Sequence, residues 1–132
     1  MIKKTLVILL VLSLFLFSFC GVLHALEIFD KVPGGIGLSV LQLYDHQNNC
    51  HTGPIVIIDI LPKGSAAKAN IERGDIITHV DEVPTSGKEF EYILEYMLRG
   101  PAYTSVILTI ERASLNKKFN ITLDRVESKG LY

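Results

Sequence analysis

The chain has 132 residues, enough for one domain of ordinary size and a targeting segment. Its formal net charge is −1 and its isoelectric point lies near 6.4, so it has no basic surplus with which to bind a nucleic acid. One of its two cysteines lies in the leading apolar run and the other in a predicted loop, an arrangement that does not indicate a disulfide framework.

Residues 1–25 have the pattern of an export segment. Lys3 and Lys4 precede an apolar run that is long enough to cross a membrane. The pattern leaves two main fates open, cleavage after Ala25 as a signal peptide or retention as a membrane anchor. Lipidation at Cys20 is a third, which the large Phe19 before it disfavours. Each of these fates predicts that residues 26–132 lie outside the cytoplasm.

A glycine-rich segment follows, Pro33-Gly34-Gly35-Ile36-Gly37-Leu38, and it leads into an alternating strand over residues 39–43. Three successive amides in a turn that glycine permits can point at one spot and form a small nest that binds an anion. Glycine also lets a ligand approach the backbone without a Cβ in the way. A plain glycine-rich hairpin turn is the alternative interpretation of these residues.

Residues 44–54 read as a polar loop that contains His46, Cys50 and His51. Their spacing matches no standard zinc pattern, and a loop rich in Asn does not hold ligands in fixed positions. We therefore expect a solvated hairpin loop and no metal site.

The central stretch, residues 53–81, reads as a strand, a short helix and a second strand. Its first apolar run, residues 55–58, is β-branched and too short for a helix, which predicts a buried strand. Ser65 is expected to cap a short helix over residues 66–69, and Asn70 to end it in the left-handed conformation.

An amphipathic helix is predicted over residues 87–98. Ser86 and Glu89 have the spacing of a capping box at its start, and Gly100 is expected to end it in the left-handed conformation. A hairpin of residues 105–112 and 117–123 should follow. The helix carries one apolar stripe, which consists of Phe90, Ile93, Leu94, Met97 and Leu98.

Four short motifs follow one another along residues 34–101. They are Gly34-Gly35-Ile36-Gly37-Leu38, Gly64-Ser65-Ala66-Ala67-Lys68-Ala69, Gly74-Asp75-Ile76-Ile77 and Leu98-Arg99-Gly100-Pro101. Residues 34–126 therefore resemble a PDZ domain, and most closely the PDZ domain of bacterial carboxyl-terminal processing proteases. The chain departs from that family at Asn70 and Glu82, where the family usually has glycine. Glu82 indicates a slightly different turn.

The resemblance implies an α+β fold. It predicts a partly closed antiparallel sheet of five to six strands with two helices over residues 26–126, and a C-terminal tail over residues 127–132. In this family the last strand takes the place of the first strand of other PDZ domains, as in a circular permutant. The tail is expected to be flexible, and it is a candidate to occupy its own peptide site or a neighbour's.

The resemblance also implies a site in which the C-terminus of a ligand adds antiparallel to the strand over residues 39–43, beside the helix. The expected carboxylate-binding loop is Gly35, Ile36, Gly37 and Leu38. The expected peptide-pairing strand contains Ser39, Val40 and Leu41, and the helix contributes Phe90, Leu94 and Met97. Among Ile36, Leu38 and these three helix residues, we expect two or three to be purely structural.

Two further expectations concern this loop. Lys31 is a candidate to support the carboxylate electrostatically, with a solvated lysine as the alternative. A Gly37→Val substitution is expected to disturb the loop while leaving the fold largely intact.

Catalysis is the competing class of function. The related proteases use a Ser–Lys dyad in a domain that follows the PDZ domain, and that domain is expected to be absent because only nine residues follow Leu123. The sequence contains no Gly-x-Ser-x-Gly motif. We therefore expect a binding module without enzymatic activity, cofactor or nucleic-acid partner.

The predicted function is binding of protein C-termini or extended segments, as an adaptor or accessory of an envelope protease or assembly. The alternative is a structural role, in which the edge of the sheet joins two envelope components without recognising a carboxylate.

Overall fold

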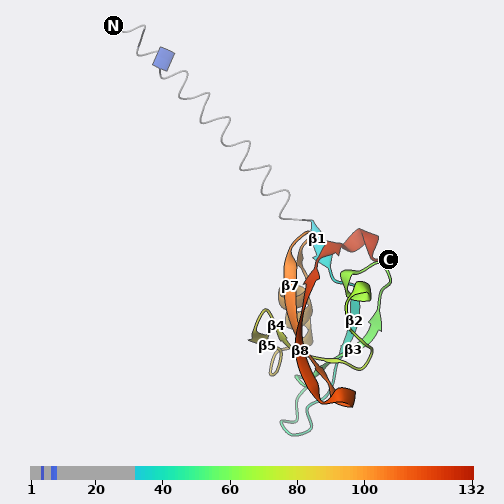
Figure 1. The fold of residues 1–132 in the computed structure, drawn as a ribbon. Helices are drawn as coiled ribbons and strands as arrows, with labels where there is room; N and C mark the ends of the chain where they lie inside the picture. Colours follow the sequence, from blue (N-terminus) through green and yellow to red (C-terminus); the bar gives the residue numbers. More distant parts are fainter. Residues whose placement is uncertain (1–3, 5–6, 9–31) are drawn as a thin grey trace. The chain divides into compact units, whose positions relative to one another are not determined.

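The computed structural model describes residues 4, 7, 8 and 32–132 (Figure 1). Most of the predicted export segment, and Lys31, lie outside the described residues. Among those that are described, no helix is long and apolar enough to cross a membrane. The chain divides into two compact units, Met1–Val32 and Pro33–Tyr132, and the second contains every strand of the described residues.

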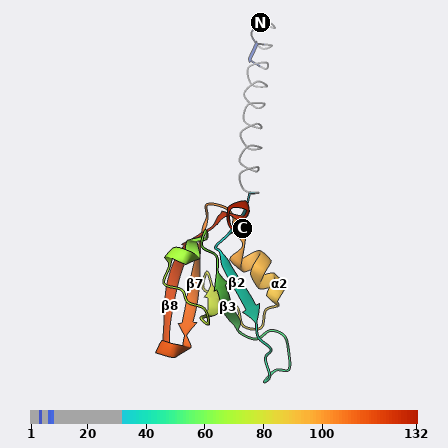
Figure 2. The ribbon, with the colours of Figure 1, turned by 90° about the vertical axis from the view of Figure 1, so that its right-hand side faces the viewer.

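The larger sheet has six strands, in the order β2-β3-β4-β7-β8 with β5 paired to β4. Each described pair in this sheet is antiparallel, and β2 lies at one edge (Figure 2). The β7–β8 hairpin, which turns through η3 (Ala113–Leu115), is confirmed. The strands are β2 (Leu38–Gln42), β3 (Ile55–Ile60), β4 (Ile76–Val80), β5 (Val83–Pro84), β7 (Ser105–Arg112) and β8 (Lys117–Asp124).

A second, three-stranded sheet was not expected. Its order is β6-β1-β9, and it joins β1 (Pro33–Gly35), β6 (Gly100–Pro101) and β9 (Val126–Glu127). Its strands are only two or three residues long, too short for an alternating pattern to be recognised in the sequence. This sheet brings the start of the domain, the end of its helix and its C-terminal segment together.

Of the two expected helices, one is a single 3₁₀ turn, η1 (Ser65–Lys68). The other is α2 (Phe90–Tyr92), which continues as η2 (Ile93–Leu98) with π-helical geometry. Neither predicted cap is present, because neither helical segment has a side-chain hydrogen bond at its N-cap. Gly64 occupies that position before η1 and Glu89 before α2.

The left-handed conformation predicted for Asn70 and Gly100 is also wrong, since neither residue has a positive φ. Gly100 belongs to β6, and a Cβ there would lie 2.9 Å from the Arg125 guanidinium carbon. This glycine is therefore required by close packing and not by its φ angle. At the β4–β5 turn, Asp81 and Glu82 have φ of 49° and 67°, so the residue that departs from the family pattern does adopt the left-handed conformation.

The hydrophobic core lies between the large sheet, α2–η2 and η1. Ile55 and Ile57 alternate inward from β3, and Val106, Leu108 and Ile110 alternate inward from β7. Each of these five side chains is fully buried and contributes about 1.5–3 kcal/mol relative to an exposed position. Because every second side chain is buried, one face of the sheet packs against the core.

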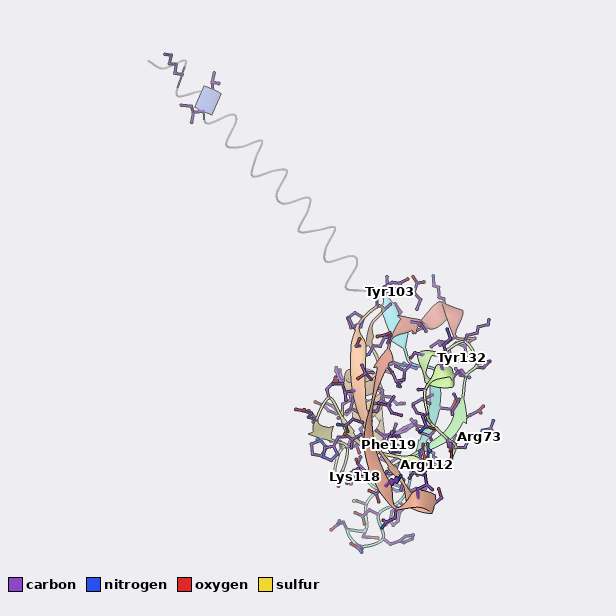
Figure 3. The ribbon with its side chains drawn as sticks, in the orientation of Figure 1. Arg73, Tyr103, Arg112, Lys118, Phe119 and Tyr132 are labelled. Atoms are coloured by element: carbon purple, nitrogen blue, oxygen red, sulfur yellow. The ribbon has the colours of Figure 1, made fainter. Side chains whose placement is uncertain are left out.

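A buried ion pair fastens the turn before β4 to the end of β7. The Arg112 guanidinium donates to both carboxylate oxygens of Asp75, at 2.8 and 2.7 Å, and to the Asn70 carbonyl oxygen at 3.1 Å. Its carbon also lies 5.2 Å from the centre of the Phe119 ring (Figure 3). Burial alone would raise the pKa of Asp75, but the hydrogen bonds from Arg112 and from the Glu72 amide outweigh it, and the pKa is lowered.

This pair predicts a loss of stability in acid. Because folding lowers the pKa of Asp75, its contribution is complete above the unfolded value and is lost as the pH falls through the folded value. Denaturant unfolding measured from about pH 6 to about pH 3 should show a steeper decline for the wild type than for Asp75→Asn. Parallel curves for the two proteins would contradict this assignment.

Candidate peptide-binding site

The site predicted from the sequence lies at the free edge of β2. Among the described strands, β2 pairs with β3 alone, and Leu41 is 48% exposed. Figure 2 shows α2 beside this edge. The side-chain Nε2 of Gln42 donates to the Lys88 carbonyl oxygen at 2.9 Å, which ties the end of β2 to the segment before α2. This hydrogen bond therefore fixes the distance between the C-terminal end of β2 and the start of α2.

The loop before β2 has its carbonyl groups directed inward. The Ile36 carbonyl oxygen accepts from the Ala66 amide of η1 at 3.0 Å, and the Gly37 carbonyl oxygen accepts from the Leu61 amide after β3 at 2.9 Å. In a trans peptide, the N–H of the next residue points the opposite way, and none of the described peptide bonds is cis. The Gly37 amide therefore points away from η1, and the Leu38 amide points away from β3.

Close contact between two glycines fixes the loop in this orientation. Gly37 has φ of 77°, and a Cβ on it would lie 2.5 Å from the Gly64 Cα. Gly64 in turn lies at the start of η1, whose Ala66 amide binds the loop. Glycine is thus needed at position 37 for both its conformation and the space it leaves.

The five candidate pocket side chains divide into two groups. Ile36 and Met97 are buried in the core, at 4% and 8% exposure. Leu38, Phe90 and Leu94 pack against that core but are only partly buried. The last three side chains are therefore the ones with surface left for a ligand.

The C-terminal segment does not form the flexible tail that was expected. β9 pairs with β1, where Val126 lies opposite Gly35, and η4 (Ser128–Gly130) follows. Leu131 is only 7% exposed, and its Cδ1 lies 3.0 Å from where a Cβ of Gly35 would be. The apolar residue of this segment thus packs on the strand that precedes the loop.

Arg125 is a residue of this region that was not predicted from the sequence. Its guanidinium donates to the carbonyl oxygens of Leu98 and Met97, at 3.0 and 3.1 Å, and to the Thr104 hydroxyl at 3.1 Å. Burial lowers its pKa. Arg125 therefore holds the C-terminal end of the helix beside the small sheet.

The sequence did contain a signal for Arg125. Every second residue of β8 faces inward, namely Phe119, Ile121 and Leu123. The next position in this series is 125. A charged residue at an inward-facing position must find hydrogen-bond partners there.

The polar loop before β3 closes through a bridge between Asp45 and Cys50. The Tyr44 ring meets His46 and His51 edge-on, at 5.0 and 4.9 Å between ring centres. Within residues 32–132 and the three described residues before them, no cluster of three or more His, Cys, Asp or Glu side chains could hold a metal ion.

Comparison with known proteins agrees with this fold. Residues 56–112 match the PDZ domain family. A carboxy-terminal-processing protease of Bartonella bacilliformis is 33% identical over 92 residues, which make up 70% of this chain and 19% of that protein. The chain thus spans about a fifth of the length of the curated relative it matches.

Two solved structures have the same fold. The photosystem II D1 C-terminal processing protease has a TM-score of 0.59 at 24% identity, over 74% of this chain and 24% of that one. The HtrA-type protease AlgW, solved with a decapeptide, has a TM-score of 0.56 at 20% identity, over 71% and 29% of the two chains. These matches and the fold of residues 33–132 show that the chain contains a PDZ domain related to those that accompany proteases.

Proposed function

We propose that this domain binds protein C-termini, or extended segments, as an added strand at the free edge of β2. The observation that carries the proposal is the direction of the loop amides: those of Gly37 and Leu38 point away from the elements that bind the loop carbonyls. They lie where a strand added to β2 would end. A terminal carboxylate is the anion that fits such a place.

The roles proposed for the individual residues follow from this placement. The loop of Gly35, Ile36, Gly37 and Leu38 would hold the carboxylate, and β2 would pair with the peptide backbone through Ser39, Val40 and Leu41. Leu38, Phe90 and Leu94 would contact the last side chain of the ligand, since they keep accessible surface. Met97 would support them from the core.

A second candidate function uses the same edge without the carboxylate. The unpaired edge of β2 and the exposed Leu41 side chain would also suit an internal segment of a partner protein, joined by main-chain hydrogen bonds alone. In that case the domain would join two components structurally, and the loop would be only a turn.

Comparison of a free-acid peptide with its amide distinguishes these functions. Each charge-assisted hydrogen bond to the carboxylate contributes about 1.5–3 kcal/mol before entropy losses. Affinity for the free acid should be around micromolar, and amidation should weaken it about tenfold or more. Titration calorimetry on the full chain measures both, and equal affinities would favour the structural function.

We further propose that the domain acts outside the cytoplasm, as a non-enzymatic adaptor or accessory of an envelope protease or assembly. The support for this location is the sequence pattern of residues 1–25. Protease added to intact spheroplasts should therefore digest residues 26–132. Protection of the whole chain would contradict the location without affecting the peptide site.

A further inference from the structure

We propose that Leu131 is a positioning residue for the peptide site, which holds Gly35 and so sets the direction of the first amide of the loop. This inference rests on the proposed function and names a residue that would act on the carboxylate without touching the peptide. Its basis is a contact between the C-terminal segment and the strand that leads into the loop.

The contact is close and nearly closed to solvent. Leu131 is 7% exposed, and a Cβ built on Gly35 would lie 3.0 Å from its Cδ1, so Leu131 fills the space that a side chain at Gly35 would need. The absence of a side chain at Gly35 is what lets Leu131 approach. The Leu131 amide donates to the Ser128 carbonyl oxygen at 3.2 Å, which closes the η4 turn that leads to Leu131.

The Gly35–Ile36 peptide carries the Ile36 amide, the first of the three that would meet a carboxylate. The other two are fixed from the far side, because the carbonyl oxygens of their peptide units bind Ala66 and Leu61. The peptide before Ile36 is fixed at Gly35, by pairing with Val126 of β9 and by packing against Leu131. Loss of Leu131 should therefore loosen the first amide more than the others.

Leu131 can act on the loop separately from the fold as a whole. It does not belong to the main hydrophobic cluster, whose members come from the large sheet, the helix and η1. Truncating it should leave that cluster packed. Truncation of Leu131 is thus expected to lower the preference for a free carboxylate while leaving the domain folded.

The test compares the full chain with Leu131→Ala, with Leu131→Met as a conservative rescue and with Leu115→Ala as a control at a leucine that is 56% exposed. The probe is a peptide that ends in leucine, prepared as the free acid and as the amide. The preference for the free acid should fall about threefold or more in Leu131→Ala, and should persist in Leu131→Met and Leu115→Ala. An unchanged preference in Leu131→Ala would overturn the inference.

Nuclear magnetic resonance of the backbone amides keeps the inference testable without a ligand. In Leu131→Ala the Ile36 amide signal should shift or broaden, while the Ile57 and Leu108 amides keep their protection from hydrogen exchange. Gly35→Ala should have the same effect, because its Cβ displaces Leu131 from the other side. An unchanged Ile36 signal, or loss of exchange protection throughout the core, would overturn the inference. A wild type that binds acid and amide equally would instead count against the proposed function.

Discussion

Replacing Arg112 with alanine is expected to lower the free energy of unfolding by about 3–5 kcal/mol, because Asp75 would remain buried without its partner. Domains of this size are stable by only about 5–15 kcal/mol, so the loss removes a large fraction of the total stability. Denaturant unfolding of the purified chain, followed by circular dichroism, measures the loss. The reason for its size is that an unpaired buried carboxylate has neither water nor a cation to stabilise its charge.

Two variants provide controls for this prediction. Lys118 forms an exposed pair with Glu111 at 3.6 Å, so Lys118→Ala should change stability by less than about 1 kcal/mol. The double variant Asp75→Leu, Arg112→Met removes both charges together and should recover part of the loss. If Arg112→Ala were as stable as Lys118→Ala, the pair would not hold the turn.

Replacing Gly37 is expected to destabilise the domain as well as the proposed peptide site. The expectation from sequence, that Gly37→Val leaves the fold largely intact, does not agree with the structure. A side chain at Gly37 meets the Gly64 backbone at 2.5 Å and must also adopt φ of 77°. The left-handed conformation costs about 1–2 kcal/mol, and the overlap about 1–3 kcal/mol more.

Gly74 offers a matched control for Gly37. Its φ is 91°, and no atom lies within 4 Å of a Cβ built on it, so Gly74→Ala has the conformational cost without the overlap. The difference in unfolding free energy between Gly37→Ala and Gly74→Ala therefore measures the contact with Gly64. Equal losses in the two variants would show that the loop can move away from η1, and that the outward directions of the Gly37 and Leu38 amides are not fixed.

The same contact explains why the loop can present its amides. η1 and the residue after β3 bind two loop carbonyls, and the Gly37–Gly64 approach leaves the loop no room to turn over. In the proposed site these amides would face outward before a ligand binds, which would reduce the ordering that binding requires. Stability of this loop and affinity for a carboxylate should consequently change together in variants at Gly64 and Ala66.

Features that depend on local periodicity and on motif order could be predicted from the amino-acid sequence. The alternation of apolar residues in β7 and β8 predicted their hairpin, and the β-branched run of β3 predicted a buried strand. The ordered glycine motifs indicated a PDZ domain, and the family match agrees. Such features are readable because each strand buries the same face along its whole length.

Contacts between residues far apart in the chain could not be predicted in this way, because they depend on how the elements pack. The caps predicted at Ser65 and Ser86 were wrong, because a short helix is stabilised by packing more than by its caps. Gly100 is required by Arg125, and Gly35 is approached by Leu131, neither of which a local pattern can indicate. Each of these contacts brings a glycine backbone against the side chain of a distant residue. Their positions depend on how the core packs and on how the strands of the small sheet pair.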